Sequence, residues 1–166
     1  MSAPTGRKIV IKRVTLDNTD LASASSGQLH TEDKIGIDDC FTTQKGALVL
    51  KEIIFYMTDT SAPTTAIDVD MFIFTNKATE ALGLSAGSSF ALNSANRNKY
   101  RVVSIDSSDF DTIDSTEKVA RKTTDFRLRP DEDVQYSLSF CLVANASITY
   151  VPSTTYEIDF IFEEAV

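Results

Sequence analysis

The sequence predicts an all-β protein in which two antiparallel sheets pack face to face as a jelly-roll-like β-sandwich, with one or two short helical turns. Segments in which apolar and polar residues alternate recur along the chain, most clearly at 134–143 and 156–163. Because successive strand side chains point to opposite faces, a period of two gives each strand one buried and one solvated face. Turn-forming residues separate the segments, and no alternation of strands with helices indicates a parallel sheet.

The two clearest strands follow the alternation closely. Five apolar residues share one parity of the segment 134–143: Val134, Tyr136, Leu138, Phe140 and Leu142. In the segment 156–163, Ile161 is the one residue that breaks the alternation between apolar and acidic side chains. Both segments therefore predict strands with one face in the core.

The N-terminal part predicts a first strand over 8–14. Its apolar and basic residues alternate, so we expect Ile9 and Ile11 to face the core. The same alternation predicts that Lys8 and Lys12 face solvent.

The next part of the chain predicts a polar loop at 18–30 and a short strand at 35–43. The run 47–57 is mostly apolar on both parities, which indicates a central strand covered on both faces. After a turn at 58–65, the segment 66–75 predicts a strand that carries two aspartates on one face.

The middle of the chain is less regular. We expect a helical turn at 78–82 that ends at Gly83, and a short helix at 93–98. A strand is expected at 100–105, followed by an acidic loop at 106–115.

Two short edge strands, at 118–123 and 126–129, complete a set of about eight or nine strands. Periodicity does not fix strand order, so a jelly roll and an immunoglobulin-like sandwich both remain open. The 166 residues suit a single domain spanning 1–166, with 1–6 as a candidate flexible N-terminal arm.

The charge distribution suggests a protein partner. A net charge of −8 argues against nucleic-acid binding, which relies on Lys and Arg at phosphates. Most of the basic residues nevertheless fall in three clusters, at 7–13, 97–101 and 118–129. Residues of the first and third clusters are candidate partner contacts: Arg7, Lys8, Lys12, Arg13, Lys118, Arg121, Lys122, Arg127 and Arg129. The alternative is that these residues only solvate strands and protect sheet edges from aggregation.

No set of residues predicts an enzyme, a cofactor or a metal centre. The sole histidine, His30, precedes the one Gly-x-Ser-x-Gly match around Ser85, whereas that motif needs a later histidine and a strand–turn–helix context. We expect Cys141 to be a small buried hydrophobe, and a Cys40–Cys141 disulfide is the alternative. No apolar run is long enough for a membrane span, and no signal peptide is visible.

The acidic loop carries the main alternative function. Four aspartates crowd it: Asp106, Asp109, Asp111 and Asp114. Carboxylate oxygens bind Ca²⁺, so the chain could instead be a β-sandwich module of a tail or fibre that binds Ca²⁺ or a carbohydrate. The spacing is not that of an EF-hand, and acidic loops are commonly just solvated.

Four segments together resemble a known family: 46–53, 67–74, 90–96 and 100–105. The second has the form apolar–Asp–apolar–Asp–apolar–Phe–apolar–Phe. This order resembles small tailed-phage virion proteins regarded as capsid decoration, or cement, proteins. The resemblance implies a non-enzymatic structural role on the shell, with the major capsid protein or another virion protein as partner and several copies acting as a homo-oligomer. It implies a virion location after synthesis in the host cytoplasm, without nucleic-acid or membrane partners, and it supplies no binding residues.

Overall fold

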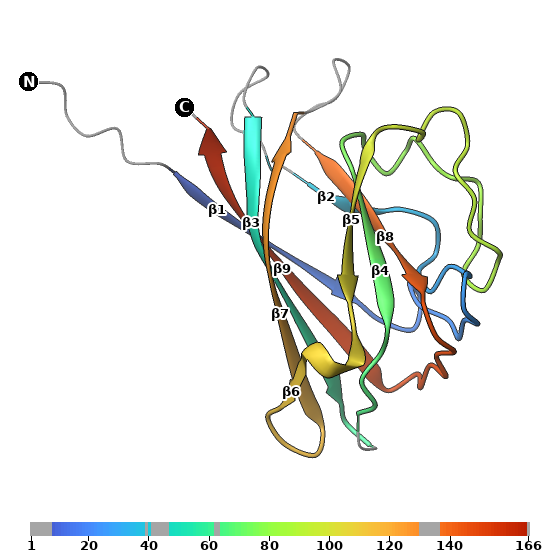
Figure 1. Cartoon of the computed structure of the whole chain (residues 1–166). Helices are drawn as coiled ribbons and strands as arrows, with labels where there is room; N and C mark the ends of the chain where they lie inside the picture. Colours follow the sequence, from blue (N-terminus) through green and yellow to red (C-terminus); the bar gives the residue numbers. More distant parts are fainter. Residues whose placement is uncertain (1–7, 39, 41–46, 62–63, 130–136, 166) are drawn as a thin grey trace, which may run out of the picture.

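The computed structural model describes residues 8–38, 40, 47–61, 64–129 and 137–165 (Figure 1). The candidate arm at 1–6 lies outside this part of the chain. The described residues form nine strands and one 3₁₀ turn: β1 (Ile9–Leu16), β2 (Ile35–Ile37), β3 (Ala47–Asp59), β4 (Val69–Phe74), β5 (Tyr100–Ile105), η1 (Ser107–Asp109), β6 (Phe110–Thr112), β7 (Glu117–Leu128), β8 (Leu138–Ala144) and β9 (Thr154–Ala165).

The strands form two antiparallel sheets whose order identifies a jelly roll. The five-stranded sheet has the order β1-β9-β3-β7-β6, and the four-stranded sheet has the order β2-β8-β4-β5. The antiparallel pairs are nested along the chain. β4 pairs with β5, and around them β3 pairs with β7, β2 with β8 and β1 with β9. A hairpin folded over in this way is the jelly-roll topology, with β6 as an added edge strand. The all-β sandwich prediction is therefore confirmed, and the strand order rules out the immunoglobulin-like alternative.

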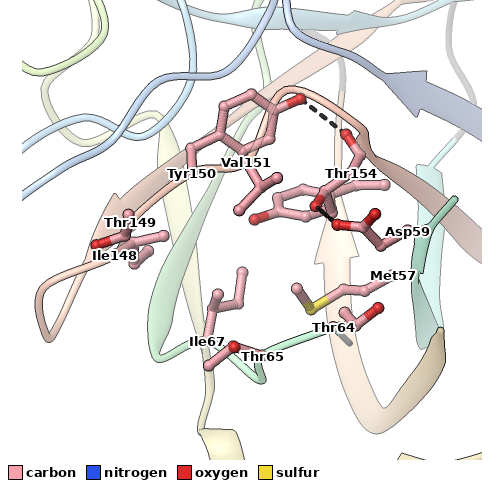
Figure 2. Close-up of a pocket in the computed structure, with 11 residues that line it drawn as sticks. Met57, Asp59, Thr64, Thr65, Ile67, Ile148, Thr149, Tyr150, Val151 and Thr154 are labelled. Atoms are coloured by element: carbon pink, nitrogen blue, oxygen red, sulfur yellow. Dashed lines mark hydrogen bonds between the residues drawn. The ribbon is translucent and has the colours of Figure 1, made fainter. Parts of the chain in front are cut away.

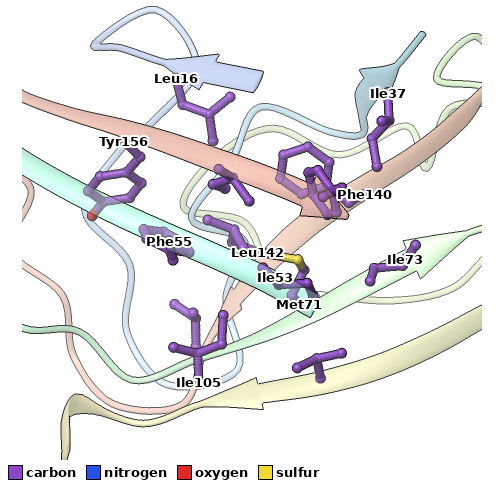
Figure 3. Packing of buried hydrophobic residues seen from close by; sticks show 14 of the residues in the cluster. Leu16, Ile37, Ile53, Phe55, Met71, Ile73, Ile105, Phe140, Leu142 and Tyr156 are labelled. Atoms are coloured by element: carbon purple, nitrogen blue, oxygen red, sulfur yellow. The ribbon is translucent and has the colours of Figure 1, made fainter. Parts of the chain in front are cut away.

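The main core lies between the two sheets (Figure 3). Val69, Met71 and Ile73 of β4 are fully buried there, as the alternation of that segment predicts. Across the sandwich, the ring of Phe140 on β8 packs against that of Phe160 on β9, with centroids 5.1 Å apart. Large apolar side chains from both sheets thus interlock, which fixes how the sheets sit against each other.

Loops cover the outer face of the four-stranded sheet (Figure 1). A second apolar cluster lies there, and its buried members are Leu29, Phe74, Leu82, Cys141 and Val143. Leu29 comes from the loop before β2 and Leu82 from the long connection between β4 and β5. Every described position of β8 is buried, because the core covers one face of the strand and loops cover the other.

A lysine and an aspartate just before β2 hold these loops together. The buried Lys34 ammonium donates to Asn76 Oδ1 at 2.6 Å and Asn96 Oδ1 at 2.8 Å. It also donates to the backbone carbonyls of Lys77 and Glu80, at 3.1 and 3.0 Å. The preceding Asp33 carboxylate accepts three backbone N–H groups, from Leu82, Gly83 and Leu84. Burial lowers the pKa of Lys34 to about 8, so at neutral pH the group remains mainly a cation.

The predicted facing of the first strand is wrong. Val10, Val14 and Leu16 of β1 pack toward the core, whereas Ile9 and Ile11 are 66% and 60% exposed. Pairing with β9 decides the parity, because Val14 lies opposite Ile158 and Leu16 opposite Tyr156, both of which are buried.

The expected helical turns also differ from the structure. The segments 78–82 and 93–98 form hydrogen-bonded turns without a helix, and the single 3₁₀ turn of the described chain is η1. Side chains of Asp33, Lys34 and Asn96 bond the backbone of 80–82. In the second segment, Asn76 Nδ2 donates to the Ala95 carbonyl at 3.4 Å. The two predicted edge strands at 118–123 and 126–129 are one strand, β7, with an irregular register opposite Leu50.

Candidate functional site

The outer face of the five-stranded sheet has no loop cover among the described residues, in contrast to the four-stranded sheet. Ile9 and Ile11 of β1 point outward, and Ile11 lies opposite the partly buried Ile161 of β9. Large aliphatic side chains on a rigid, uncovered sheet are typical of a surface that another protein buries. We call this surface, defined by the outward residues of β1, β9 and β3, the outer sheet face.

An ordered ion pair lies next to these isoleucines on the outer sheet face. The Arg13 guanidinium donates to both carboxylate oxygens of Asp159, at 2.7 and 2.8 Å, and approaches Glu157 at 3.4 Å. The central carbon of the Arg13 guanidinium, Cζ, lies 5.6 Å from the centre of the Tyr56 ring. The bond to Asp159 raises the pKa of Arg13 above its ordinary value. A bidentate pair over an aromatic ring gives this part of the face a fixed geometry.

The predicted basic contacts do not form one patch. Lys8, Lys12 and Arg13 lie on or beside β1. The other described candidates lie on or just after β7, and the strands β9 and β3 lie between β1 and β7. Arg7 lies outside the described residues. Three of the described candidates are already in salt bridges, since Arg13 binds Asp159, Arg121 binds Glu52 at 3.4 Å and Lys122 binds Asp109 at 2.7 Å.

Two of the candidate partner contacts lie in a cluster of basic residues that the sequence analysis did not predict. Arg127 and Arg129, at the end of β7, line an open groove of about 390 Å³ together with Lys99 and Arg101. Lys99 and Arg101 lie at the start of β5, whereas Arg127 and Arg129 lie at the end of β7, so the fold brings these four cations together. Lys118 is not part of this groove and donates to Thr112 Oγ1 at 2.8 Å.

The acidic loop does not gather its carboxylates around a common point. Asp109 accepts from the Asp106 backbone N–H at 2.8 Å and pairs with Lys122, while Asp114 accepts from Thr116. In the part of the chain that the structure describes, no group of three or more His, Cys, Asp or Glu could hold a metal ion. The loop side chains thus stabilise local turns, which does not favour the Ca²⁺ alternative.

The histidine and the cysteines serve the core. His30 is fully buried, with Nδ1 at 2.6 Å from the Ala22 carbonyl and Nε2 at 2.8 Å from the Tyr156 hydroxyl. Because a carbonyl only accepts, Nδ1 carries the proton and Nε2 accepts from Tyr156, so the ring is a neutral structural link. Cys40 and Cys141 are both buried and no disulfide joins them, which corrects the disulfide alternative.

Because His30 is buried in its neutral form, we expect the folded protein to lose stability in acid. Burial lowers its pKa from 6.5 to about 4, so the unfolded chain binds the proton more readily than the folded one. The stabilisation is complete above pH 6.5 and is lost as the pH falls toward 4, by about 3 kcal/mol in total. Urea denaturation should show the free-energy difference between wild type and His30→Gln shrinking by that amount from pH 7 to pH 4. Parallel pH profiles would contradict this.

One pocket in the described part of the chain is too small for a ligand. It lies beside the start of β9 and holds about 40 Å³, little more than one water molecule (Figure 2). Its polar groups are bonded to one another, since Tyr150 donates to the Thr154 carbonyl at 2.7 Å and Thr154 donates to Asp59 at 2.8 Å. A neighbouring open hollow of about 310 Å³ is lined without any aromatic ring on which a sugar could stack. Neither favours the carbohydrate alternative.

Comparisons with known proteins do not place the chain in a family. No protein-family model matches it, and no curated protein matches it. The chain is similar to one in a structure of turnip yellow mosaic virus, with 10% identity, a TM-score of 0.30 and coverage of 97% and 96% of the two chains.

Two other solved structures are similar at the same level. One is a full particle of heated Israeli acute paralysis virus, with 7% identity, a TM-score of 0.34 and coverage of 96% of this chain and 72% of that one. The other is sacbrood virus of the honeybee, with 9% identity, a TM-score of 0.31 and the coverages 96% and 72%. Similarities this weak carry no argument about function. No helix among the described residues could span a membrane.

Proposed function

We propose that this protein is a non-enzymatic structural protein of a tailed-phage virion, a capsid decoration protein that binds the assembled shell. The observation that carries the proposal is the outer sheet face, where Ile9 and Ile11 lie exposed on an otherwise well-packed sandwich. A protein with that role needs a rigid scaffold and a contact surface, and it needs no reactive group. In this proposal, the outer sheet face lies against the shell surface.

Two further features support a virion role. The jelly roll is an architecture that viral capsid domains share with lectins and cupins, so the fold is compatible with a virion role without selecting it. The segments 46–53 and 67–74 resemble tailed-phage decoration proteins, and in the structure they form much of β3 and β4 at the centres of the two sheets. The resemblance therefore falls on the structural centre of the sandwich.

In the proposed mechanism, binding of this protein to the assembled shell favours the assembled state over free capsid subunits. A protein that binds the shell and not the free subunits stabilises the shell, by about 2.7 kcal/mol per site at a hundredfold excess over Kd. The partner is the major capsid protein or another virion protein. Because a symmetric shell repeats its sites, copies bound side by side act together as a homo-oligomer.

Changing one isoleucine of the outer sheet face should weaken shell binding. We expect Ile11→Glu to reduce the amount of protein that co-sediments with shells at least tenfold, because a carboxylate would be buried in the interface. Ile113→Glu is the matched control, since Ile113 is 59% exposed but lies just after β6, away from β1. Equal binding by Ile11→Glu and wild type would remove the outer sheet face as the contact.

A further inference from the structure

We propose that the basic groove between β5 and β7 binds an extended acidic segment of a partner protein. This site is separate from Ile9 and Ile11, and it does not depend on the partner being a shell. Four cationic side chains line the groove: Lys99, Arg101, Arg127 and Arg129. The groove of about 390 Å³ is open to solvent, which suits a chain segment that lies in it more than a small enclosed ligand.

The charges of the groove are suited to carboxylates. Among the described residues, no acidic side chain lines it, although the whole chain has a net charge of −8. Among the described residues, Arg101, Arg127 and Arg129 make no salt bridge, whereas Arg13 and Arg121 do. Guanidinium groups bind carboxylates with two parallel hydrogen bonds, so three arginines without an acidic partner favour an acidic ligand.

Two strand edges flank the groove and make an extended polypeptide the fitting ligand. β5 is the last strand of the four-stranded sheet. β6 pairs with only three residues of β7, 118–120, so in the described chain the rest of that edge of β7 has no neighbouring strand. Free edges carry backbone donors and acceptors that an added strand can pair with, while its alternate side chains reach flanking pockets.

The same features disfavour a nucleic acid, the other polyanion that four cations could attract. A nucleic acid has no peptide groups to pair with a strand edge. Base stacking needs an accessible aromatic face. Tyr100, the aromatic residue of the groove, is packed against Phe72 and Phe74, with centroid distances of 5.3 and 6.2 Å.

The test uses the full chain and a fluorescent eight-residue peptide in which glutamate alternates with threonine. We expect saturable binding by anisotropy at low salt, weakened at least tenfold by the double variant Arg101→Glu, Arg127→Glu. Arg121→Glu is the matched control, because Arg121 lies on β7 outside the groove and is also exposed, and its affinity should stay within twofold of wild type. Circular dichroism melting curves check that each variant is folded.

Several results would overturn the proposal. These are the absence of saturable binding, an equal loss of affinity in the Arg121→Glu control, and tighter binding of an oligothymidylate of the same length. The acidic residues Asp131, Glu132 and Asp133 follow Arg129 in the sequence. If the peptide bound only after they were replaced by the corresponding amides, the occupant would be the chain's own segment, and an external partner would be ruled out. None of these outcomes depends on whether the protein binds shells.

Discussion

Replacing Lys34 with methionine should destabilise the protein by about 4 kcal/mol, because buried oxygens lose their donor. The ammonium serves four oxygens, on Asn76, Asn96, Lys77 and Glu80, and lies 4.6 Å from the centre of the Phe74 ring. Methionine has a similar length and fills the space, but it donates no hydrogen bond, so the effect isolates the polar network from packing. Urea denaturation followed by circular dichroism measures the change.

Lys51→Met is the control for the loss of a lysine. The Lys51 ammonium pairs at 2.8 Å with Asp125 at the surface, where the Asp125 side chain is 79% exposed. Surface pairs of this kind contribute less than about 1 kcal/mol, so this variant should be close to wild type. A loss below about 1 kcal/mol for Lys34→Met would mean that the loops over the four-stranded sheet do not depend on Lys34.

Phe140→Ala should cost about 3–5 kcal/mol, the range for removing a large aromatic side chain from a packed core. Phe140 is fully buried on β8 and meets Phe160 of β9 from the opposite sheet, so its removal opens a cavity between the sheets (Figure 3). Phe140→Leu keeps most of the volume and should cost about 1–2 kcal/mol. Chemical denaturation tests both, and equal losses for the two variants would contradict a cavity as the cause.

The sequence is sufficient to predict the class of fold and most strand positions. The strand at 100–105 is confirmed with the same bounds as β5, and the alternation at 66–75 correctly places Val69, Met71 and Ile73 in the core. Such patterns are local, because burial of one strand face requires a period of two whatever the partner strand is. The nested strand pairing depends on contacts between distant segments, and the alternation within one strand does not indicate which strand lies beside it.

The first strand shows where local pattern fails. Over 8–14, the larger side chains of Ile9 and Ile11 suggest the wrong parity. A segment extended to Leu16 favours the observed parity, because Val10, Val14 and Leu16 outnumber the two isoleucines. The apolar residues on both parities of β1 are themselves a signal, since the outward ones are the exposed residues of the outer sheet face.

The remaining features of the candidate sites could not be predicted from local sequence. Nothing around Lys34 distinguishes it from a surface lysine, because its oxygen partners come from a loop more than 40 residues away. The basic groove likewise depends on β5 and β7 meeting at the edges of different sheets. Of the candidate contacts, Arg127 and Arg129 lie in that groove, whereas Arg13 is held by Asp159.

The most direct test of the account is the addition of purified protein to phage shells assembled without it. We expect the protein to bind at a fixed, saturable copy number and to raise the melting temperature of the shells, while free capsid subunits neither bind it nor change their stability. Binding that saturates without any rise in melting temperature would contradict stabilisation. No binding at saturating concentrations would contradict the proposed role as a decoration protein.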